Sequence, residues 1–399
     1  MLTEKQLQRY AEVLLWALVT ARSGRMKKRE IVLIQYHRPA LRLAEILYRE
    51  LLRVGRHPIQ RLLPTPVMEK EFYTHSDDPQ LTFIPPGEEQ LYAQLNGTIF
   101  LYAPESITHL QKIDARKIGK VALARKPLKN ITDGRDEQGR FSWTLCVYPT
   151  EELASHAGLS LQDYTHQVVQ ACFLNRKEPV AHWRRIFRDI GAIKKKMDRL
   201  DIESLHIESD RTDLHVTPGA SRKWLGLSGH NIPSFEIFTS PDWRGTNGVY
   251  FADQPSFRNG NTVRNVRLEF KDGIVVGVKA EDGMTFLKKQ LAMDSGARRI
   301  GEFSLTDKRY SRINAFMANT LYDENYGGKY GNCHVALGSS YTEAYTGKLF
   351  PPSPETKKKL GFNDSALHWD LVNTEAKRVT AHLKTGERMV IYQKGSFTL

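Results

Sequence analysis

The chain has 399 residues, of which 40% are hydrophobic and 26% are charged, and its formal net charge is +13 at pH 7. This length allows two or more domains with a substantial core, and this composition excludes an intrinsically disordered chain. The sequence contains no run of eighteen apolar residues, so no transmembrane helix and no membrane partner are predicted.

The start of the chain and its cysteines indicate the compartment. The first residues alternate polar with apolar side chains and include Glu4, which is unlike a signal peptide. Cys146, Cys172 and Cys333 are few, odd in number and widely spaced, which argues against a disulfide framework and against a cysteine-rich zinc knuckle. We therefore expect a cytoplasmic protein with reduced thiols.

The first 150 residues alternate helical and strand-like patterns. A helical stripe runs from Leu7 to Leu18, and a second helix is expected over residues 40–54, with Gly55 as its C-terminal cap. Strand-like runs cover residues 31–34, 59–63, 98–102 and 142–148. This alternation predicts an open α/β sheet with parallel strands. The turn after the first strand reads QYHRPA and has no glycine-rich fingerprint, so neither a dinucleotide site nor a P-loop is indicated.

Helices are expected next, from Thr150 to about Leu200, with Thr150 and Ser160 as N-caps. The last helix contains the basic stretch Arg184 to Arg199, and two further basic stretches cover residues 25–29 and 357–359. Apolar residues recur at helical spacing through the last helix, so its basic residues are predicted to lie on the solvated face. Positive charge suggests nucleic acid, but no nucleic-acid motif accompanies it, and we do not expect that partner.

Beyond Leu205 the pattern becomes strand-like. The alternating residues 263–270 and 274–278 are joined by Lys271-Asp272-Gly273, which is typical of a hairpin turn. We place a domain boundary near residue 220. The predicted fold is an N-terminal open α/β sheet domain with a helical second half, residues 1–220, followed by a C-terminal mixed α+β domain, residues 221–399.

Side chains that bind metals are concentrated in the second domain. The glycine-rich stretch 321–341 contains Asp323, Glu324 and His334, which are residue types that hold divalent ions. The alternative is a mobile surface loop with incidental polar residues. Farther on, His368 and Asp370 are two residues apart, so on a strand they share one face and can bind one metal centre.

Several of these residues also have structural interpretations when each is taken alone. Glu236 can cap or pair with an arginine, Glu302 can be a surface carboxylate, and His368 can be a satisfied core histidine. Cys333 precedes His334, but adjacent residues of an extended chain point oppositely, so a buried packing thiol is favoured over a soft ligand. Taken together, the carboxylates favour a metal site, because a divalent ion offsets the repulsion among them.

Four pieces of sequence carry a family resemblance. In chain order they are NIPSFEIFTSP with Glu236, GEF with Glu302, HVALGSSY with His334 and Tyr341, and HWD with His368 and Asp370. This order resembles the co-catalytic metallo-aminopeptidases typified by aminopeptidases T, S and II. The similarity extends through residues 143–213 and covers most of the chain. Two departures bear on the shape of the pocket: Phe235 replaces a usual glycine, and the loop from Gly327 to His334 is longer.

The resemblance implies a cytoplasmic, homodimeric aminopeptidase that acts on peptides with a free N-terminus. It implies two divalent ions, of zinc, cobalt, manganese or magnesium, held by Glu236, Glu302, His334, His368 and Asp370. Tyr341 is then the residue that stabilises the oxyanion. The general base stays open between Glu324, our candidate, and Glu302 acting as both ligand and base.

Two other classes of function remain open. A different metal-dependent hydrolase, such as a phosphoesterase, uses the same ligand types, and a basic surface attracts its anionic substrate. A catalytically silent relative that binds nucleic acid is the second.

Overall fold

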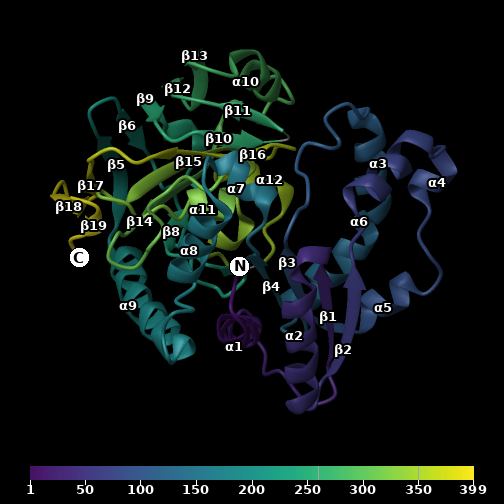
Figure 1. Ribbon diagram of the computed structural model, residues 1–399. Coiled ribbons are helices and arrows are strands. Elements are labelled where there is room, and N and C mark those ends of the chain that lie inside the picture. Colours follow the sequence, from purple (N-terminus) through teal and green to yellow (C-terminus); the bar gives the residue numbers. More distant parts are fainter. Residues whose placement is uncertain (259, 349) are drawn as a thin grey trace. The chain divides into compact units, whose positions relative to one another are not determined.

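The computed structural model describes residues 1–258, 260–348 and 350–399. Within them the chain forms two compact units (Figure 1). The first comprises Met1–Trp183 and Ser228–Pro233, and the second comprises Arg184–Leu227 and Ser234–Leu399. The boundary expected near residue 220 stays a prediction, because compactness does not by itself define a domain that folds alone.

The first unit is built on a parallel sheet with the strand order β2-β1-β3-β4-β7. In β1, Val32, Leu33 and Ile34 are all buried, as expected for a strand that is covered on both faces. The predicted open α/β sheet is therefore confirmed. The strands are β1 (Ile31–Tyr36), β2 (His57–Leu62), β3 (Leu95–Tyr102), β4 (Trp143–Val147) and β7 (Asn231–Ile232).

The ends of the first two helices follow from local chemistry. At the start of α1, Thr3 Oγ1 accepts a hydrogen bond from the Gln6 N–H, and the Gln6 side chain accepts one from the Thr3 N–H. Gly55, with φ +74°, follows α2 and confirms the predicted cap. Helices of this unit include α1 (Glu4–Thr20), η1 (Arg38–Ala40), α2 (Leu41–Arg53), α3 (Pro66–His75), α4 (Asp78–Thr82), α5 (Glu88–Gln94), α6 (Ala115–Glu137), α7 (Glu151–Ala157) and α8 (Leu161–Ala171).

The helical run after residue 150 is confirmed. Thr150 and Ser160 cap α7 and α8, each accepting a backbone N–H with its side-chain oxygen. The run ends with α9 (Pro179–Arg199), which begins in the first unit and ends in the second. Trp183 and Met197 on its apolar stripe are buried, whereas Arg188 is exposed. Most basic residues of this helix thus lie on the solvated side, as predicted, whereas Lys194 is partly buried and its Nζ donates to the Gly226 carbonyl.

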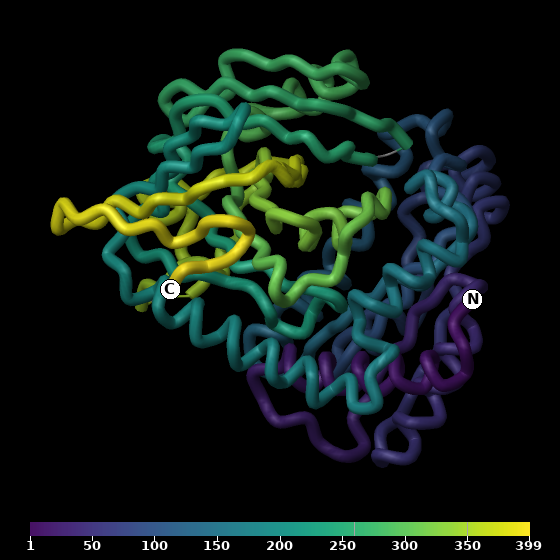
Figure 2. Tube along the Cα trace, turned by 60° about the vertical axis from the view of Figure 1, so that its left-hand side comes forward, coloured from purple at the N-terminus to yellow at the C-terminus, as the bar shows by residue number. Residues whose placement is uncertain are grey.

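The second unit contains a large antiparallel sheet in the order β13-β12-β9-β6-β5-β17-β18-β19. Figure 2 shows the C-terminal part of the chain, in yellow, folded back beside the teal segment that contains β5, with which β17 pairs. The strands are β5 (Ile202–Glu208), β6 (Asp213–Val216), β9 (Asn247–Ala252), β12 (Val266–Lys271), β13 (Ile274–Lys279), β17 (Arg378–Leu383), β18 (Arg388–Gln393) and β19 (Ser396–Phe397).

The hairpin predicted in this sheet is present, but its first strand is shorter than expected. Asn265 has φ +49°, which interrupts the extended backbone, so residues 263–270 do not form one strand. They divide instead between β11 (Asn261–Val263), which pairs with β10 (Ser256–Arg258), and β12. Asp272 and Gly273 both have positive φ and form the two-residue turn between β12 and β13.

A smaller antiparallel sheet of the second unit, in the order β16-β15-β14-β8, is called the site sheet below. Its strands are β8 (Glu236–Thr239), β14 (Ile300–Thr306), β15 (Asn332–Gly338) and β16 (His368–Asn373). The Tyr250 hydroxyl of β9 donates to the carbonyls of Cys333 and Leu371, and that of Tyr392 in β18 donates to Thr306. The large sheet therefore supports the site sheet. Other elements of this unit are η2 (Trp243–Gly245), α10 (Met284–Leu291), α11 (Thr320–Asp323), η3 (Thr342–Ala344) and α12 (Pro354–Lys359).

All three cysteines lie in the interior of the protein. Cys146, Cys172 and Cys333 are all free and buried. Burial raises the pKa of the Cys333 thiol to about 11, in keeping with an inert packing residue. In the part of the chain that the structure describes, no helix combines the length and the apolar character needed to cross a membrane.

Candidate metal centre

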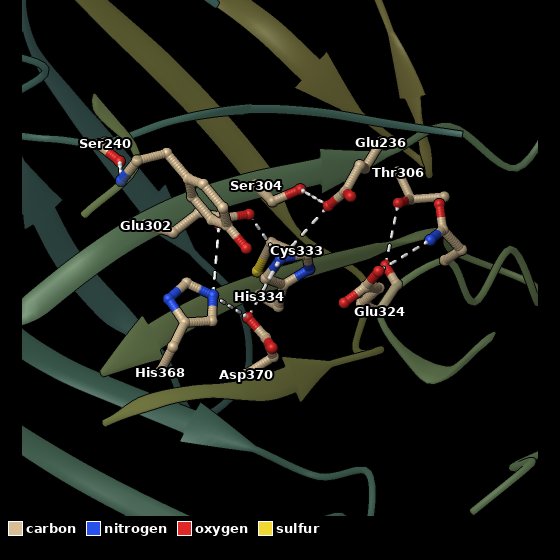
Figure 3. A network of polar contacts seen from close by, with 12 residues as sticks. Glu236, Ser240, Glu302, Ser304, Thr306, Glu324, Cys333, His334, His368 and Asp370 are labelled. Atoms are coloured by element: carbon tan, nitrogen blue, oxygen red, sulfur yellow. Dashed lines mark hydrogen bonds and ion pairs between the residues drawn. The ribbon is translucent and has the colours of Figure 1, made fainter. Parts of the chain in front are cut away.

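One face of the site sheet gathers the five expected ligands (Figure 3). Directly opposed residues of antiparallel strands share a face, as do residues two apart along one strand. Ala336 lies directly opposite Glu302 on one side and Asp370 on the other, and His334 lies directly opposite Ser304. By the same rule the shared face carries Glu236 from β8, Glu302 from β14, His334 from β15, and His368 and Asp370 from β16.

Small residues leave space between these side chains. Ala336 and Gly338 follow His334 on the same face, so β15 presents no large group beside Asp370 or His368. Gly301 precedes Glu302 at a register shift in β14, and a Cβ there would lie 2.3 Å from the carbonyl oxygen of Ser339. Only glycine allows this close approach of two backbones.

His334 lies at the centre of the cluster. Its Nε2 atom is 3.1 Å from Glu302 Oε1, 3.4 Å from Glu236 Oε2 and 3.8 Å from Asp370 Oδ1. The ring is fully buried, and its Nδ1 atom has no hydrogen-bond partner among the described residues. Three carboxylates thus converge on one imidazole.

His368 and Asp370 meet on one face of β16, as their spacing predicts. His368 Nε2 is 3.4 Å from Asp370 Oδ1 and 3.7 Å from Glu302 Oε2. On its other edge, His368 Nδ1 lies 2.9 Å from the Ser339 carbonyl and donates to it. A carbonyl partner of this kind orients an imidazole and leaves the opposite nitrogen free for a metal. Trp369 between them is buried on the opposite face.

Burial and mutual repulsion perturb the acids and bases of the cluster. Burial, with neighbouring Glu302, raises the pKa of Glu236 to about 8. Burial alone would lower the pKa of His334 and His368, but the surrounding carboxylates raise these pKa values to about 9 and about 10. Burial would raise the pKa of Asp370, but His368 lowers it to about 2. Without cations, the cluster therefore retains protons at neutral pH.

Glu324 faces the same cluster from the turn after α11 (Figure 3). Burial and the charges of Glu236, Asp370 and Glu302 raise its pKa well above the usual value. Glu324 and Asp370 also line one small pocket together with Phe257.

Asp323, the neighbouring carboxylate, has a structural role. Its two oxygens accept the backbone N–H groups of Met317 and Asn319 at 2.8 and 2.9 Å. Both oxygens are thereby used to hold the preceding loop.

Tyr341 stands beside His368, with ring centroids 5.0 Å apart. The Tyr341 backbone N–H donates to Ser240 Oγ at 2.7 Å, which fixes the start of this segment. Burial and then the nearby carboxylates raise the pKa of Tyr341, so its phenol stays protonated and remains a donor.

The glycine-rich stretch differs from the expected ligand-aiming loop. His334 belongs to β15, and a Cβ on Gly327 would lie 2.6 Å from the Ser311 carbonyl oxygen, so this glycine allows two backbone segments to pack closely. Phe235, the departure from the family pattern, is fully buried, and its N–H donates to Asn325 Oδ1. The extra bulk at this position is therefore accommodated in the interior just before β8.

Sequence reasoning missed the residues that support the ligands. Ser304 Oγ donates to Glu236 Oε2 at 2.9 Å. The alternation along GEFSLT could have found it, because Ser304 is two residues after Glu302 and shares its face. The partner of His368 is the backbone carbonyl of Ser339. The sequence could not have indicated it, because every residue has such a carbonyl.

The donor set fits divalent ions. The ligand atoms form two groups, and within each group they all lie within 4.8 Å of one another. One group is Glu236, Glu302 and His334, and the other is Glu302, His368 and Asp370. Such carboxylate and imidazole sets suit zinc, cobalt or manganese. The crowding of three buried carboxylates around the His334 imidazole is a feature that cations would relieve.

Comparisons with known proteins agree on one family. The sequence profile of the family described as thermophilic metalloprotease (M29) matches residues 3–397. Aminopeptidase 2 of Geobacillus stearothermophilus is 31% identical over 77% of this chain and 78% of its own length. Aminopeptidase T of Thermus aquaticus is 28% identical over 73% of this chain and 74% of its own length. Wild-type AmpT from Thermus thermophilus has the same fold, with a TM-score of 0.80, 20% identity and full coverage of both chains.

Proposed function

The chain belongs to the thermophilic metalloprotease (M29) family, and from this premise we propose how its residues carry out the reaction of an aminopeptidase. It is a metal-dependent hydrolase of peptide bonds, and its curated relatives are named as aminopeptidases. Family membership thus favours this activity over a phosphoesterase and over a silent nucleic-acid-binding relative. The observation that carries the detailed proposal is the single face that Glu236, Glu302, His334, His368 and Asp370 share.

We propose that Glu302 would help to hold both of two divalent ions. One of its oxygens is nearest to His334 and the other to His368, and it belongs to both groups of ligand atoms. Glu236 and His334 would hold one ion with Glu302, and His368 and Asp370 would hold the other. When bound, two such ions would lower the pKa of a water, polarise the scissile carbonyl and accept an unprotonated α-amine.

Glu324 is the proposed general base. Glu302 is the weaker candidate, because both of its oxygens face histidines of the cluster. Glu324 lies beside Asp370, and its Oε1 atom accepts a long hydrogen bond, 3.4 Å, from Asn325 Nδ2. Neighbouring positive charge favours the ionised carboxylate, so in the loaded site Glu324 can take a proton from water and return it to the leaving amine.

Tyr341 is the proposed donor to the oxyanion. Its raised pKa keeps the phenolic proton in place, and the ring is held between Phe238 and His368. A donor that is already oriented stabilises the negative charge that develops on the carbonyl oxygen.

The test uses leucine p-nitroanilide and its N-acetylated form, before and after chelation and with metal add-back. We expect hydrolysis of the free amine form only, loss of activity on chelation and recovery with added ion. Zinc, cobalt, manganese and magnesium are compared in the add-back. Equal cleavage of both substrates would contradict amine capture, and release from a phosphodiester dye instead would support the phosphoesterase.

Two further properties belong to the proposal. The three free cysteines support a reducing compartment, and we infer the cytoplasm. We also infer a homodimer from the family resemblance. Light scattering at micromolar concentration measures the mass, and a monomer would contradict the inference.

A further inference from the structure

A second cluster of metal-binding side chains lies on the large sheet, between β5 and β6. His206 is directly opposite His215, and Glu208 is directly opposite Asp213. Residues that alternate with them, such as Leu205 and Leu214, are fully buried. The two cross-strand pairs therefore share the outer face of the sheet.

The side chains of this face are close together. His206 Nε2 lies 2.7 Å from Asp213 Oδ1, and His206 Nδ1 lies 3.7 Å from Glu208 Oε2. The rings of His206 and His215 stack with centroids 4.2 Å apart and planes 7° apart. One ligand atom each from His206, Asp213 and His215 lies within 4.8 Å of the others.

Polar residues are ordinary on the outer face of an antiparallel sheet, so composition alone indicates nothing. The arrangement is more specific than the composition, because two imidazole rings stack against each other and a carboxylate is hydrogen-bonded to one of them. Arg378 and His382 of β17 lie on the same face, opposite Glu208 and Ser204.

We propose that His206, Asp213 and His215 form a surface site for a divalent transition-metal ion of the zinc, nickel or copper class. Two imidazoles and a carboxylate suit these ions rather than magnesium or calcium, which prefer oxygen ligands. Asp213 and His215 are exposed, so small side-chain rotations can complete the coordination. The bound ion cross-links β5 to β6. This site is on a different sheet from the candidate metal centre and does not depend on the function proposed for it.

The first experiment counts ions. Full-length chain without a histidine tag is loaded with zinc by equilibrium dialysis, and its metal content is measured by elemental analysis. We expect wild type to bind one more zinc ion per chain than His215→Asn or His206→Asn. The matched control, His382→Asn, removes a neighbouring histidine of the same face outside the ligand group and keeps the wild-type count. Peptidase activity stays unchanged in all three variants.

The second experiment needs no substitution. Copper(II) is added in equimolar amount to zinc-loaded wild type, and its electron paramagnetic resonance spectrum is recorded. We expect the hyperfine splitting of imidazole nitrogens together with release of the one zinc ion held by the surface site, and loss of that splitting in His215→Asn. Equal zinc content in wild type and in His215→Asn overturns the proposal. A spectrum of copper without nitrogen ligands also overturns it.

Discussion

Glu302 is the residue on which the arrangement of the candidate centre depends. It is buried, it hydrogen-bonds His334, and it is the member common to both groups of ligand atoms. A buried carboxylate among other carboxylates is costly unless positive charge accompanies it. Substitution of single residues therefore tests the metal hypothesis most directly.

His368→Ala and Asp370→Ala should each lower the metal content and abolish most of the activity, because each removes a proposed ligand. Trp369→Phe is the matched control in the same strand. Trp369 lies on the other face, where its Nε1 donates to Ser256 Oγ at 2.8 Å. This control should keep its metal and lose about 1 kcal/mol of the free energy of unfolding. Elemental analysis measures the metal content of the three variants, and chemical denaturation measures their stability. Full metal occupancy in both alanine variants would mean that the site is misplaced.

Tyr341→Phe should behave differently from the ligand variants. Removing one hydrogen-bond donor to an oxyanion typically lowers kcat by about 100- to 1,000-fold. The metals do not need this hydroxyl, so the metal content should stay at the wild-type value. Steady-state kinetics measures the loss of kcat, and elemental analysis checks that the metal content is unchanged. A variant with wild-type kcat would exclude Tyr341 as the oxyanion donor.

At the scale of elements, the site sheet places its ligands through register. The bulge at Gly301 brings Glu302 onto the face of His334 and Asp370, and the close backbone of Ser339 leaves no room for a side chain there. The motif GEF therefore combines a ligand with the glycine that allows its strand to pack.

Gly301→Ala should lower the free energy of unfolding by about 1–3 kcal/mol, because the added Cβ forces backbone atoms apart. Its metal content should also fall, since Glu302 is displaced with β14. The matched control is Gly191→Ala in α9, where a Cβ would meet nothing within 4 Å. There alanine should be neutral or stabilise by about 0.4–1 kcal/mol. Denaturation curves measure both, and equal stability of the two variants would rule out the packing explanation.

At the scale of the whole molecule, metal binding should be linked to protons. The pKa values of Glu236, His334 and His368 in the metal-free site are raised to about 8, 9 and 10, so these groups hold protons at pH 7. A bound ion must displace them. Below these pKa values the apparent metal affinity should therefore rise with pH, about tenfold per pH unit for each displaced proton.

Calorimetry of zinc binding at pH 7 in two buffers of different ionisation enthalpy measures this release. Protein that has been freed of metal by chelation should give binding enthalpies that differ between the two buffers. The sign of the difference should show that the protein releases protons when zinc binds. Enthalpies that are equal in the two buffers would show that the site is already deprotonated, contrary to the pKa values above.

The local features of the protein follow from short stretches of its sequence. Capping residues located the helix starts at Thr150 and Ser160, and an Asp-Gly pair located the hairpin turn at residues 272–273. The spacing of His368 and Asp370 placed both on one face of a strand, because the direction of a side chain along a strand follows from its position alone. The family motif selected the five ligand types, and the parallel sheet of the first unit followed from alternating hydrophobic patterns.

Which distant residues meet depends on the packing of the whole chain. Glu236 lies beside His334 because β8 pairs with β14 and β14 with β15 in one register, and that register depends on packing between segments far apart in the chain. The same contacts distinguish adjacent carboxylates: Asp323 binds backbone N–H groups, whereas Glu324 faces the cluster. They also bring His206 opposite His215, a pair that no sequence motif marks. Such pairings are nonlocal, so no short stretch of sequence encodes them.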